Sequence, residues 1–437
     1  MSFEPLEITI ESLSHDGRGI AAIDGKTTFV SGALPQEKVL CKITKKHRRY
    51  NDAQTVKVIT PAPTRTSPAC KHYGLCGGCS MQHVHMDAQI QFKQHALLEQ
   101  LKHFGQVIPE NILPPISSLS DGYRRKARLG VRYVKKKGKL LVGFREKHSN
   151  YLAELEQCTI LHPSVGTRLI ALSQLIHGLS QYEHMPQVEV AISDEATALI
   201  FRHMTPLTEA DIAALCEFGD THHMHIYLQP NPPAPIHKIW PKDQQDWLRY
   251  FLPDYQLEMH FHPLDFTQVN SEVNILMIKQ ALQLLNLQPT DTVLDLFCGL
   301  GNFTLPIARF AKEVVGIEGN RQMVERARKN AAHNQITNVQ FDIANLLEPS
   351  KTAHWLQKRY NKILLDPPRT GAKEIIPYIA SSAAQSIVYV SCNPATLARD
   401  AGDLVYNYAY KLTHLGVINM FPHTSHIEAI ALFEKSH

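Results

Sequence analysis

Four apolar segments in the final third of the chain each end in a polar residue or lead directly to one, and this repetition constrains the fold more than any other feature. They are Thr292–Asp295, Val314–Glu318, Asn338–Phe341 and Lys362–Asp366, with helix-type sequence between them. Apolar runs without strict alternation are typical of strands covered on both faces, as in parallel sheets flanked by helices. Ligands bind such sheets beyond the carboxyl ends of the strands. The pattern predicts a doubly wound α/β domain with a site at that edge.

The ligand of this domain is predicted from the loop after the first strand. Gly299-Leu-Gly301 alone is weak evidence, and Thr304 occupies the third glycine position of a dinucleotide fingerprint. Asp295 would repel a pyrophosphate but suits a cationic, phosphate-free nucleoside such as S-adenosylmethionine. Glu318 ends the next strand, where its carboxylate can accept both ribose hydroxyl protons. We therefore expect the methyltransferase version of a Rossmann-like fold and not an NAD domain.

A cysteine follows another apolar segment. Ile387–Val390 is strand-like, and Asn393-Pro394 stops it directly after Cys392. A lone cysteine is usually a small buried hydrophobe. Here Asp366 ends a neighbouring strand, so a thiol and a carboxylate are predicted to share one crevice.

A second cysteine pattern lies near residue 70. Cys70, Cys76 and Cys79 fall within ten residues, with Gly77-Gly78 between the last two, and Cys158 is the next cysteine along the chain. Neither a secretory signal nor a membrane-length apolar run is visible, so we expect a cytoplasmic protein whose cysteines bind metal or catalyse. Zinc and a [4Fe-4S] cluster are both chemically allowed. Three near cysteines plus a remote one favour the cluster.

Two further regions predict RNA binding. Residues from about 5 to 60 read as five short strands, typical of a small barrel, and a Pro-rich linker follows. From Asp121 to Lys147 there are eleven Lys and Arg against two acidic residues, a charge of +9 in a chain whose net charge is +4. This segment reads as a hairpin whose Arg and Tyr can stack on unpaired bases while Lys binds phosphate. A helix over Asp87–Phe104 is expected to be scaffold, and residues 163–260 read as an α+β insert without evident chemistry.

Longer motifs resemble a known family. Ser14-His-Asp-Gly-Arg-Gly-Ile-Ala21 with Phe29-Val-Ser-Gly-Ala-Leu-Pro35 looks like a TRAM domain, an OB-like RNA-binding barrel. The four cysteines, Asp366-Pro-Pro-Arg369, Ser391-Cys-Asn-Pro-Ala-Thr-Leu-Ala-Arg-Asp400 and Met420-Phe-Pro-His-Thr-Ser-His-Ile-Glu428 resemble the RNA uracil-C5 methyltransferase family. The combination of barrel and cysteines is similar to the branch that acts on 23S rRNA. The implied domains are 1–60 (TRAM), 61–265 (central, with an iron-sulfur cluster) and 266–437 (methyltransferase).

The resemblance implies residue roles. Cys392 would add to uracil C6, Asp366 would orient the ring, and Glu428 would be the base that removes the C5 proton. We expect the site to lower the pKa of Cys392. Phe266 could stack on a ligand, and Asn345 is preferred over Asp342 at the adenine edge. The predicted S-adenosylmethionine contacts are Gln268, Phe297, Asn302, Glu318, Asn345 and Asp366, and the predicted cluster ligands are Cys70, Cys76, Cys79 and Cys158.

The expected partner is 23S rRNA, with no membrane and no obligate protein partner. Two alternatives stay open at this stage. One is the same chemistry on tRNA or on another rRNA uridine, and the other is an RNA-binding iron-sulfur protein without turnover.

Overall fold

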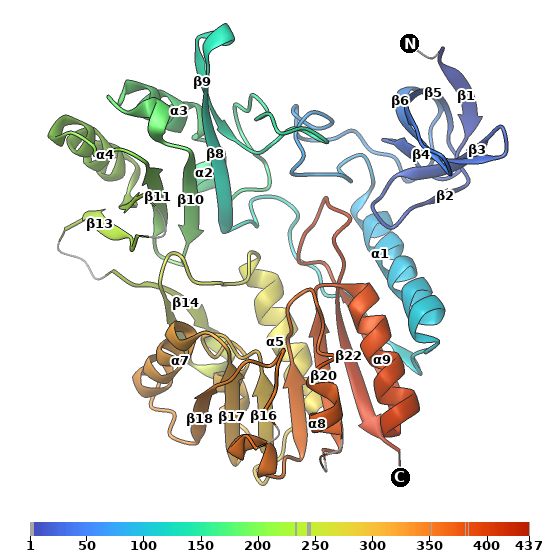
Figure 1. The fold of residues 1–437 in the computed structure, drawn as a ribbon, viewed down its shortest axis with the longest axis vertical. Helices are drawn as coiled ribbons and strands as arrows, with labels where there is room; N and C mark the ends of the chain where they lie inside the picture. The colour runs from blue at the N-terminus through green and yellow to red at the C-terminus, as the bar shows by residue number, and fades with distance from the viewer. Residues whose placement is uncertain are drawn as a thin grey trace. The chain divides into compact units, whose positions relative to one another are not determined.

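The structure, a computed structural model, describes residues 4–231, 234–242, 246–350, 352–380, 382 and 384–436. The chain divides into two compact units, which are both drawn in Figure 1. The first comprises Met1–Ala96, Phe144–Leu155 and Phe421–His426, and the second comprises Leu97–Gly143, Glu156–Met420 and Ile427–His437.

A six-stranded sheet dominates the first unit. Its order is β1-β5-β6-β4-β3-β2, and its bounds are β1 Leu6–Thr9, β2 Ser12–Leu13, β3 Gly19–Ile23, β4 Lys26–Ser31, β5 Lys38–Lys46 and β6 Asn51–Thr60. All five expected strands are present, with the short β2 added. Alternating residues such as Val39, Cys41 and Ile43 point into one apolar core because successive strand side chains face opposite sides.

The first unit also contains a loop from near the C-terminus. Phe421–His426 lies against α1 (Met86–Gln100) and the segment before it. The backbone N–H of His423 donates to Gln89 Oε1 at 2.9 Å, and Lys93 Nζ donates to Phe421 O at 2.9 Å. Gln89 and Lys93 are both fully buried. A buried amide and a buried ammonium therefore fix the backbone of this loop.

The second unit is built on an eight-stranded sheet with the order β18-β17-β16-β19-β20-β22-β21-β7 (Figure 1). Its strands are β7 Asn111–Ile112, β16 Thr292–Leu296, β17 Glu313–Glu318, β18 Val339–Ile343, β19 Lys362–Leu365, β20 Ser386–Ser391, β21 Tyr410–Ile418 and β22 Glu428–Lys435. Strands β16 to β20 pair in parallel, whereas β22 runs antiparallel between β20 and β21. The predicted doubly wound sheet is confirmed.

Helices accompany this sheet in alternation with its strands. They are α5 Ser271–Leu285, α6 Thr304–Ala308, α7 Arg321–His333, α8 Ile376–Ala380 and α9 Pro394–Tyr408. Asn270 caps the N-terminus of α5, because its side chain accepts a hydrogen bond from Val273 N at 3.2 Å. Helix α7 packs on β17 and β18, and α9 packs on β21 and β22.

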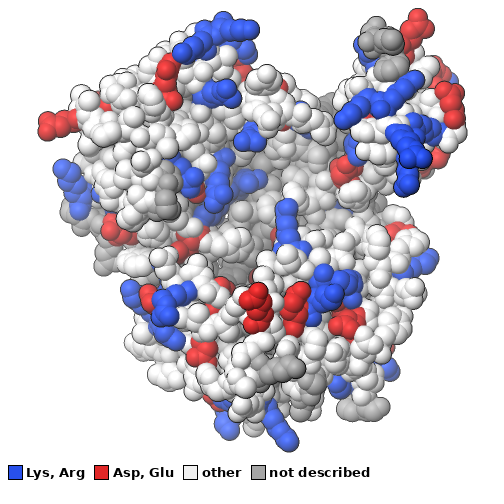
Figure 2. Space-filling view, viewed as in Figure 1, with Lys and Arg blue, Asp and Glu red and all other residues white. Residues whose placement is uncertain are grey.

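A second, six-stranded sheet in this unit has the order β13-β12-β11-β10-β8-β9. Its strands are β8 Lys126–Val134, β9 Lys139–Gly143, β10 Gln187–Ile192, β11 Thr197–His203, β12 Met224–Pro230 and β13 His237–Trp240, accompanied by α2 Pro163–Gly166, α3 Leu169–Gly178 and α4 Glu209–His222. A separate hairpin joins β14 Leu248–Leu252 to β15 Leu257–Phe261. The basic segment is a hairpin as predicted, and Figure 2 shows Lys and Arg gathered at the tip of β8 and β9.

One expectation about α1 is wrong. The scaffold helix is expected to extend to Phe104, but α1 ends at Gln100 and the side chain of Phe104 is 70% exposed. The final turn, Leu101–Gly105, is π-helical, so it breaks the 3.6-residue periodicity. A Cβ at Gly105 would lie 2.3 Å from Ala398 O, so this turn approaches α9 as closely as only glycine allows.

The three-domain division stays a prediction. Strand β7, from the region assigned to the central domain, pairs with β21 in the methyltransferase-type sheet. Within the described part of the chain, the structure contains no helix with the length and apolar character needed to span a membrane.

Candidate active site

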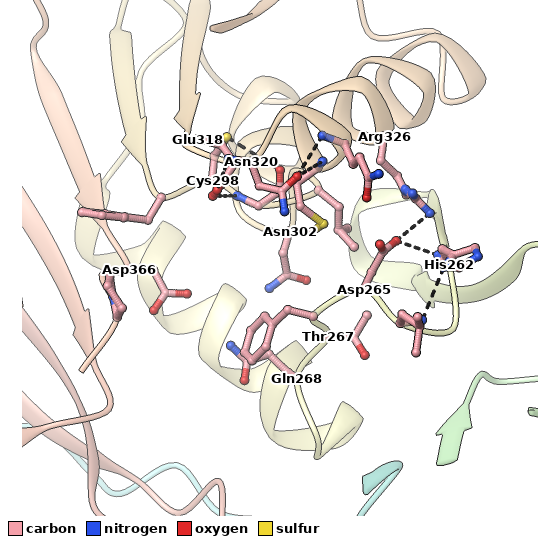
Figure 3. A pocket seen from close by; sticks show the side chains of 18 of the residues that line it. His262, Asp265, Thr267, Gln268, Cys298, Asn302, Glu318, Asn320, Arg326 and Asp366 are labelled. Atoms are coloured by element: carbon pink, nitrogen blue, oxygen red, sulfur yellow. Dashed lines mark hydrogen bonds and ion pairs between the residues drawn. The ribbon is translucent and has the colours of Figure 1, made fainter. Parts of the chain in front are cut away.

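A cavity of ≈ 1280 Å³ opens at the carboxyl ends of the parallel strands in the second unit (Figure 3). Strand pairing explains why its polar groups converge: Leu296 pairs with Ile317, and Leu365 pairs with Tyr389. The residues that follow these strands therefore emerge at one edge of the sheet. Those in the cavity wall include Phe297, Asn302, Glu318, Asp366 and Cys392.

The turn after β16 forms one wall. Phe297 has φ +64°, a left-handed conformation that is unfavourable for an aromatic residue, and Gly299 and Gly301 follow with φ +55° and +95°. Gly299 N donates to Glu318 Oε2 at 3.2 Å, and Asn320 N donates to Glu318 Oε1 at 2.9 Å. The backbone thus fixes the carboxylate of Glu318 at the rim. Strained backbone of this kind is concentrated at functional sites.

Asn302 is held by its neighbours. Its Oδ1 accepts hydrogen bonds from Tyr250 Oη at 2.8 Å and from Asn274 Nδ2 at 3.1 Å. Its own Nδ2 donates to Asn274 Oδ1 at 2.8 Å. Since its oxygen already has two donors, Asn302 can offer a ligand only the second hydrogen of its Nδ2.

Two carboxyl groups of the site have strongly raised pKa values. Complete burial raises the pKa of Asp295 to about 8, with the negative charges of Asp366 and Glu318 acting in the same direction and a hydrogen bond from Thr304 opposing them. Burial raises the pKa of Asp366 to about 7. The carboxyl groups of Glu318 and Asp366 line the cavity beside the glycine turn, and such groups suit a cationic nucleoside such as S-adenosylmethionine better than a dinucleotide with its anionic pyrophosphate.

Cys392 lies between β20 and α9. Asn393 caps the helix by accepting from Ala395 N at 3.2 Å, and its Nδ2 donates to Arg369 O at 2.9 Å. Ser391 pairs with Ala429 at the end of the antiparallel ladder, and Cys392 and Glu428 follow directly beyond that pair. Both residues line the cavity, and Glu428 raises the pKa of the Cys392 thiol. A thiol and a buried carboxylate are therefore neighbours, as the predicted nucleophile and base require.

The expectation about the thiol pKa is wrong for the ligand-free protein. Burial raises the pKa of Cys392 to about 11, and Glu428 and Asp366 raise it further in that order, while Arg369 lowers it. The carboxylates needed around the substrate disfavour a second negative charge on sulfur.

The structure brings most predicted site residues to one cavity. Its wall contains Gln268, Phe297, Asn302, Glu318, Asp366, Cys392, Glu428 and also Phe266. Asn345 is exposed and is not part of this wall, and its Oδ1 accepts from Leu347 N at 3.1 Å. Asp342 lies 3.1 Å from His354 Nε2. The roles of individual residues, including the adenine contact, stay predictions.

Some residues of the site were not found from the sequence. Tyr250 and Asn274 position Asn302, and the ion pair of Arg326 with Asp265 at 2.7 Å supports the opposite wall. Nothing in a single sequence separates them from ordinary surface or helix residues, because their role arises from contacts between distant segments.

Two family models match the chain. Residues 87–436 match the model described as tRNA (Uracil-5-)-methyltransferase, and residues 1–56 match the TRAM domain. The chain belongs to the tRNA (Uracil-5-)-methyltransferase family. The expected TRAM domain and methyltransferase fold are thereby confirmed.

Curated relatives of this family member cover almost its full length. A protein of Hahella chejuensis named 23S rRNA (uracil(1939)-C(5))-methyltransferase RlmD is 52% identical, over 99% of this chain and 98% of its own. The protein of the same name from Nitrosococcus oceani is 50% identical, over 100% of this chain and 97% of its own. The crystal structure of Pyrococcus abyssi tRNA (uracil-54, C5)-methyltransferase in complex with S-adenosyl-L-homocysteine shares the fold, with a TM-score of 0.75, 23% identity and coverage of 98% and 100%.

The predicted metal ligands are divided between the two units. Cys70, Cys76 and Cys79 lie in an irregular segment of the first unit, where Gly78 N donates to Cys76 Sγ at 3.4 Å. Burial raises the pKa of the Cys76 thiol. Cys158 belongs to the second unit, so the four-cysteine site stays a prediction.

Proposed function

We propose that this family member methylates C5 of uracil 1939 in 23S rRNA with S-adenosylmethionine, as the names of its relatives state for them. The observation that supports the chemistry is that Cys392 and Glu428 directly follow the last pair of the β20–β22 ladder and line a cavity that also contains Asp366. A ribosomal RNA substrate would place the reaction in the cytoplasm.

The chemistry follows from the weak nucleophilicity of uracil C5. When the Cys392 thiolate adds to C6, the electrons of the C5–C6 double bond move into an enolate, and C5 becomes electron-rich. Glu428 then removes the C5 proton after C5 has been methylated, and the electrons of that C–H bond restore the double bond as the thiolate leaves. Asp366, with a pKa of about 7, can orient the ring through its N3–H or O4, depending on its own protonation. The target base must be flipped out of its stack, at about a few kcal/mol.

The residues that would hold S-adenosylmethionine are those around the glycine turn. When bound, this cofactor supplies an electrophilic methyl group on a sulfonium centre. Glu318 presents a carboxylate fixed by two backbone N–H groups, which suits a ribose diol, and Phe297 and Gln268 complete the wall. Asn345 is kept as a proposed adenine contact.

The activity is tested by transfer of a labelled methyl group to unmodified 23S rRNA, followed by mapping of the modified base. Label at a single uracil, and none on tRNA transcripts, is expected. Methylation of tRNA alone would refute the proposed substrate but leave the reaction class intact. RNA binding without any transfer would refute both.

The nucleophile is tested with RNA that contains 5-fluorouracil. This base cannot lose its C5 substituent, so the enzyme should remain covalently attached to it. The cavity offers a matched control, because Cys298 is its second thiol. Cys392→Ala should abolish the adduct and Cys298→Ala should retain it; the opposite pattern would reassign the nucleophile.

The base is tested on natural uridine. Glu428→Gln should still form the covalent adduct and accept the methyl group, but elimination should stall, so that a covalent RNA complex accumulates. Release of product at the native rate would exclude Glu428 as the base.

We also propose that Cys70, Cys76, Cys79 and Cys158 bind a [4Fe-4S] cluster with a structural role. The support is the thiolate-only donor set, the spacing of the first three and the N–H···S contact at Cys76, which is typical of cluster ligands. Protein purified without oxygen should contain about four irons and little zinc per chain. Cys79→Ser should lose iron and stability but retain S-adenosylmethionine binding. Stoichiometric zinc without iron would overturn the cluster.

A further inference from the structure

Two histidines and a glutamate converge in the second unit, outside the cavity wall. Glu258 and His260 lie on the same face of β15, two residues apart, and His333 ends α7. His260 Nε2 lies 2.6 Å from Glu258 Oε1, and His333 Nε2 lies 3.6 Å from the same oxygen. The three ligand atoms all lie within 4.8 Å of one another.

Asn330 of α7 and Asn334, which follows the helix directly, hold the strand residues in place. Asn330 pairs with the backbone of His260, accepting from its N–H at 2.9 Å and donating to its carbonyl at 3.1 Å. Asn334 does the same for Glu258, with both bonds at 2.8 Å. Two strand residues and the helix end that carries His333 are thus fixed in register, and Asn330 is fully buried. The ligand positions are organised before any ion arrives.

We propose that Glu258, His260 and His333 form a binding site for a divalent transition metal, with Zn²⁺ as the best fit. Zinc binds imidazole nitrogen and carboxylate oxygen at about 2.0–2.2 Å, which places tetrahedral neighbours roughly 3.4 Å apart. The separations of 2.6 and 3.6 Å lie on either side of that value, so small side-chain rotations suffice. His333 is 43% exposed, which leaves the fourth position open to water.

Arg249 opposes the ion. Its Nη1 lies 3.0 Å from Glu258 Oε1, and the same guanidinium binds Glu195 through Nε at 2.5 Å and Nη2 at 2.9 Å. A metal ion would displace only the contact to Glu258, since the two bonds to Glu195 do not involve that oxygen. Removal of the guanidinium should therefore tighten metal binding. If the three residues form only an ion-pair cluster, the same substitution would remove one contact and would not create any affinity for a metal.

The site would fasten β15 to α7. Helix α7 also carries Met323, Arg326 and Lys329, which line the cavity. Because a bound metal would link the C-terminal end of α7 to β15, it should raise the melting temperature of the protein. The three ligands lie outside the cavity wall, so the metal would take no part in the reaction.

The test is titration of the full-length holoprotein with Co²⁺, followed by displacement with Zn²⁺. Cobalt bound to nitrogen and oxygen ligands gives visible d–d bands but lacks the intense charge-transfer absorption of cobalt bound to cysteine sulfur. The spectrum therefore distinguishes binding at Glu258, His260 and His333 from binding at the four predicted cysteine ligands. We expect one equivalent bound and a higher melting temperature. Glu258→Gln and His333→Gln should weaken binding at least tenfold and abolish the rise in melting temperature, and Arg249→Gln should tighten binding.

A matched control is His354→Gln. His354 also contacts a carboxylate, Asp342 at 3.1 Å, but is outside the three-ligand group. Its replacement should leave the cobalt spectrum unchanged. If Glu258→Gln fails to fold, His333→Gln still tests the site, because His333 lies at an exposed helix end where its replacement should not disturb folding. Absence of stoichiometric binding, or binding that these substitutions do not alter, would overturn the site.

Discussion

The raised pKa of Cys392 makes a quantitative prediction about the ligand-free enzyme. With a pKa of about 11 against an ordinary 9.0, only about one thiol in a thousand is ionised at pH 8, compared with roughly one in ten for an unperturbed cysteine. Since the thiolate is the species that alkylates, Cys392 should react with iodoacetamide about a hundredfold more slowly than an unperturbed thiol. Glu428 is the larger of the two charge contributions. Glu428→Gln should lower the pKa by roughly one unit and accelerate alkylation about tenfold at pH 8.

The assay follows alkylation of the Cys392 peptide by mass spectrometry from pH 6 to 10, which separates it from the other seven cysteines of the chain. Asp366→Asn should accelerate alkylation only above about pH 7, because the Asp366 carboxyl itself is protonated below that pH. Glu325→Gln is the control, since this acidic residue lines the cavity and the charges that shift the pKa of the thiol are those of Glu428, Asp366 and Arg369. An apparent pKa at or below 9 in the native ligand-free protein would refute the reasoning.

Three further predictions concern stability. The folded-state pKa of Asp295 is about 8 against an ordinary 3.8, so the stability contributed by its neutral form is present below pH 4 and is lost as pH rises to 8. The unfolding free energy of Asp295→Asn relative to that of the native protein should therefore increase by about 1.4 kcal/mol per pH unit across that window, which a comparison of the two melting temperatures at each pH will detect. Lys93→Met should lower the unfolding free energy in urea by about 1–3 kcal/mol, because it leaves the carbonyl of Phe421 without this buried donor; an unchanged midpoint would contradict the contact. Phe297→Gly should be about 1 kcal/mol more stable than Phe297→Ala, since both remove the ring but only glycine relieves the left-handed backbone; equal stabilities would show that the strain is absent.

The fold of the final third was predictable because its information is local. The segment predicted as Lys362–Asp366 is strand β19, Lys362–Leu365, and its polar tip lies at the edge of the sheet where the cavity opens. Strand order is a different matter. The insertion of β22 between β20 and β21 depends on pairing across tens of residues, which hydrophobic periodicity does not encode.

The site shows the same division. Cys392 was predicted from its position between a strand and a turn, which is a local pattern. Glu428 was predicted only from the family resemblance, because the pairing of β22 with β20 brings it near Cys392 and a sequence pattern does not show this pairing. The direction of the thiol pKa was missed since it depends on burial and on carboxylates that the fold assembles. The contact of Asn302 with the cofactor stays a prediction, but the sequence did not show that its oxygen accepts from Tyr250 and Asn274, which leaves one hydrogen of its Nδ2 for a ligand.

The reversed direction of β22 has a consequence for chains released early from the ribosome. A nascent chain that stops after residue 392 but before 428 already carries the thiol, yet β20 lacks the strand that pairs with it on that side. Its unpaired backbone groups would form an exposed edge of the kind that aggregates. The same strand that completes the sheet begins with the proposed base. A product that ends in this interval would therefore expose an unpaired sheet edge and would also lack the proposed base.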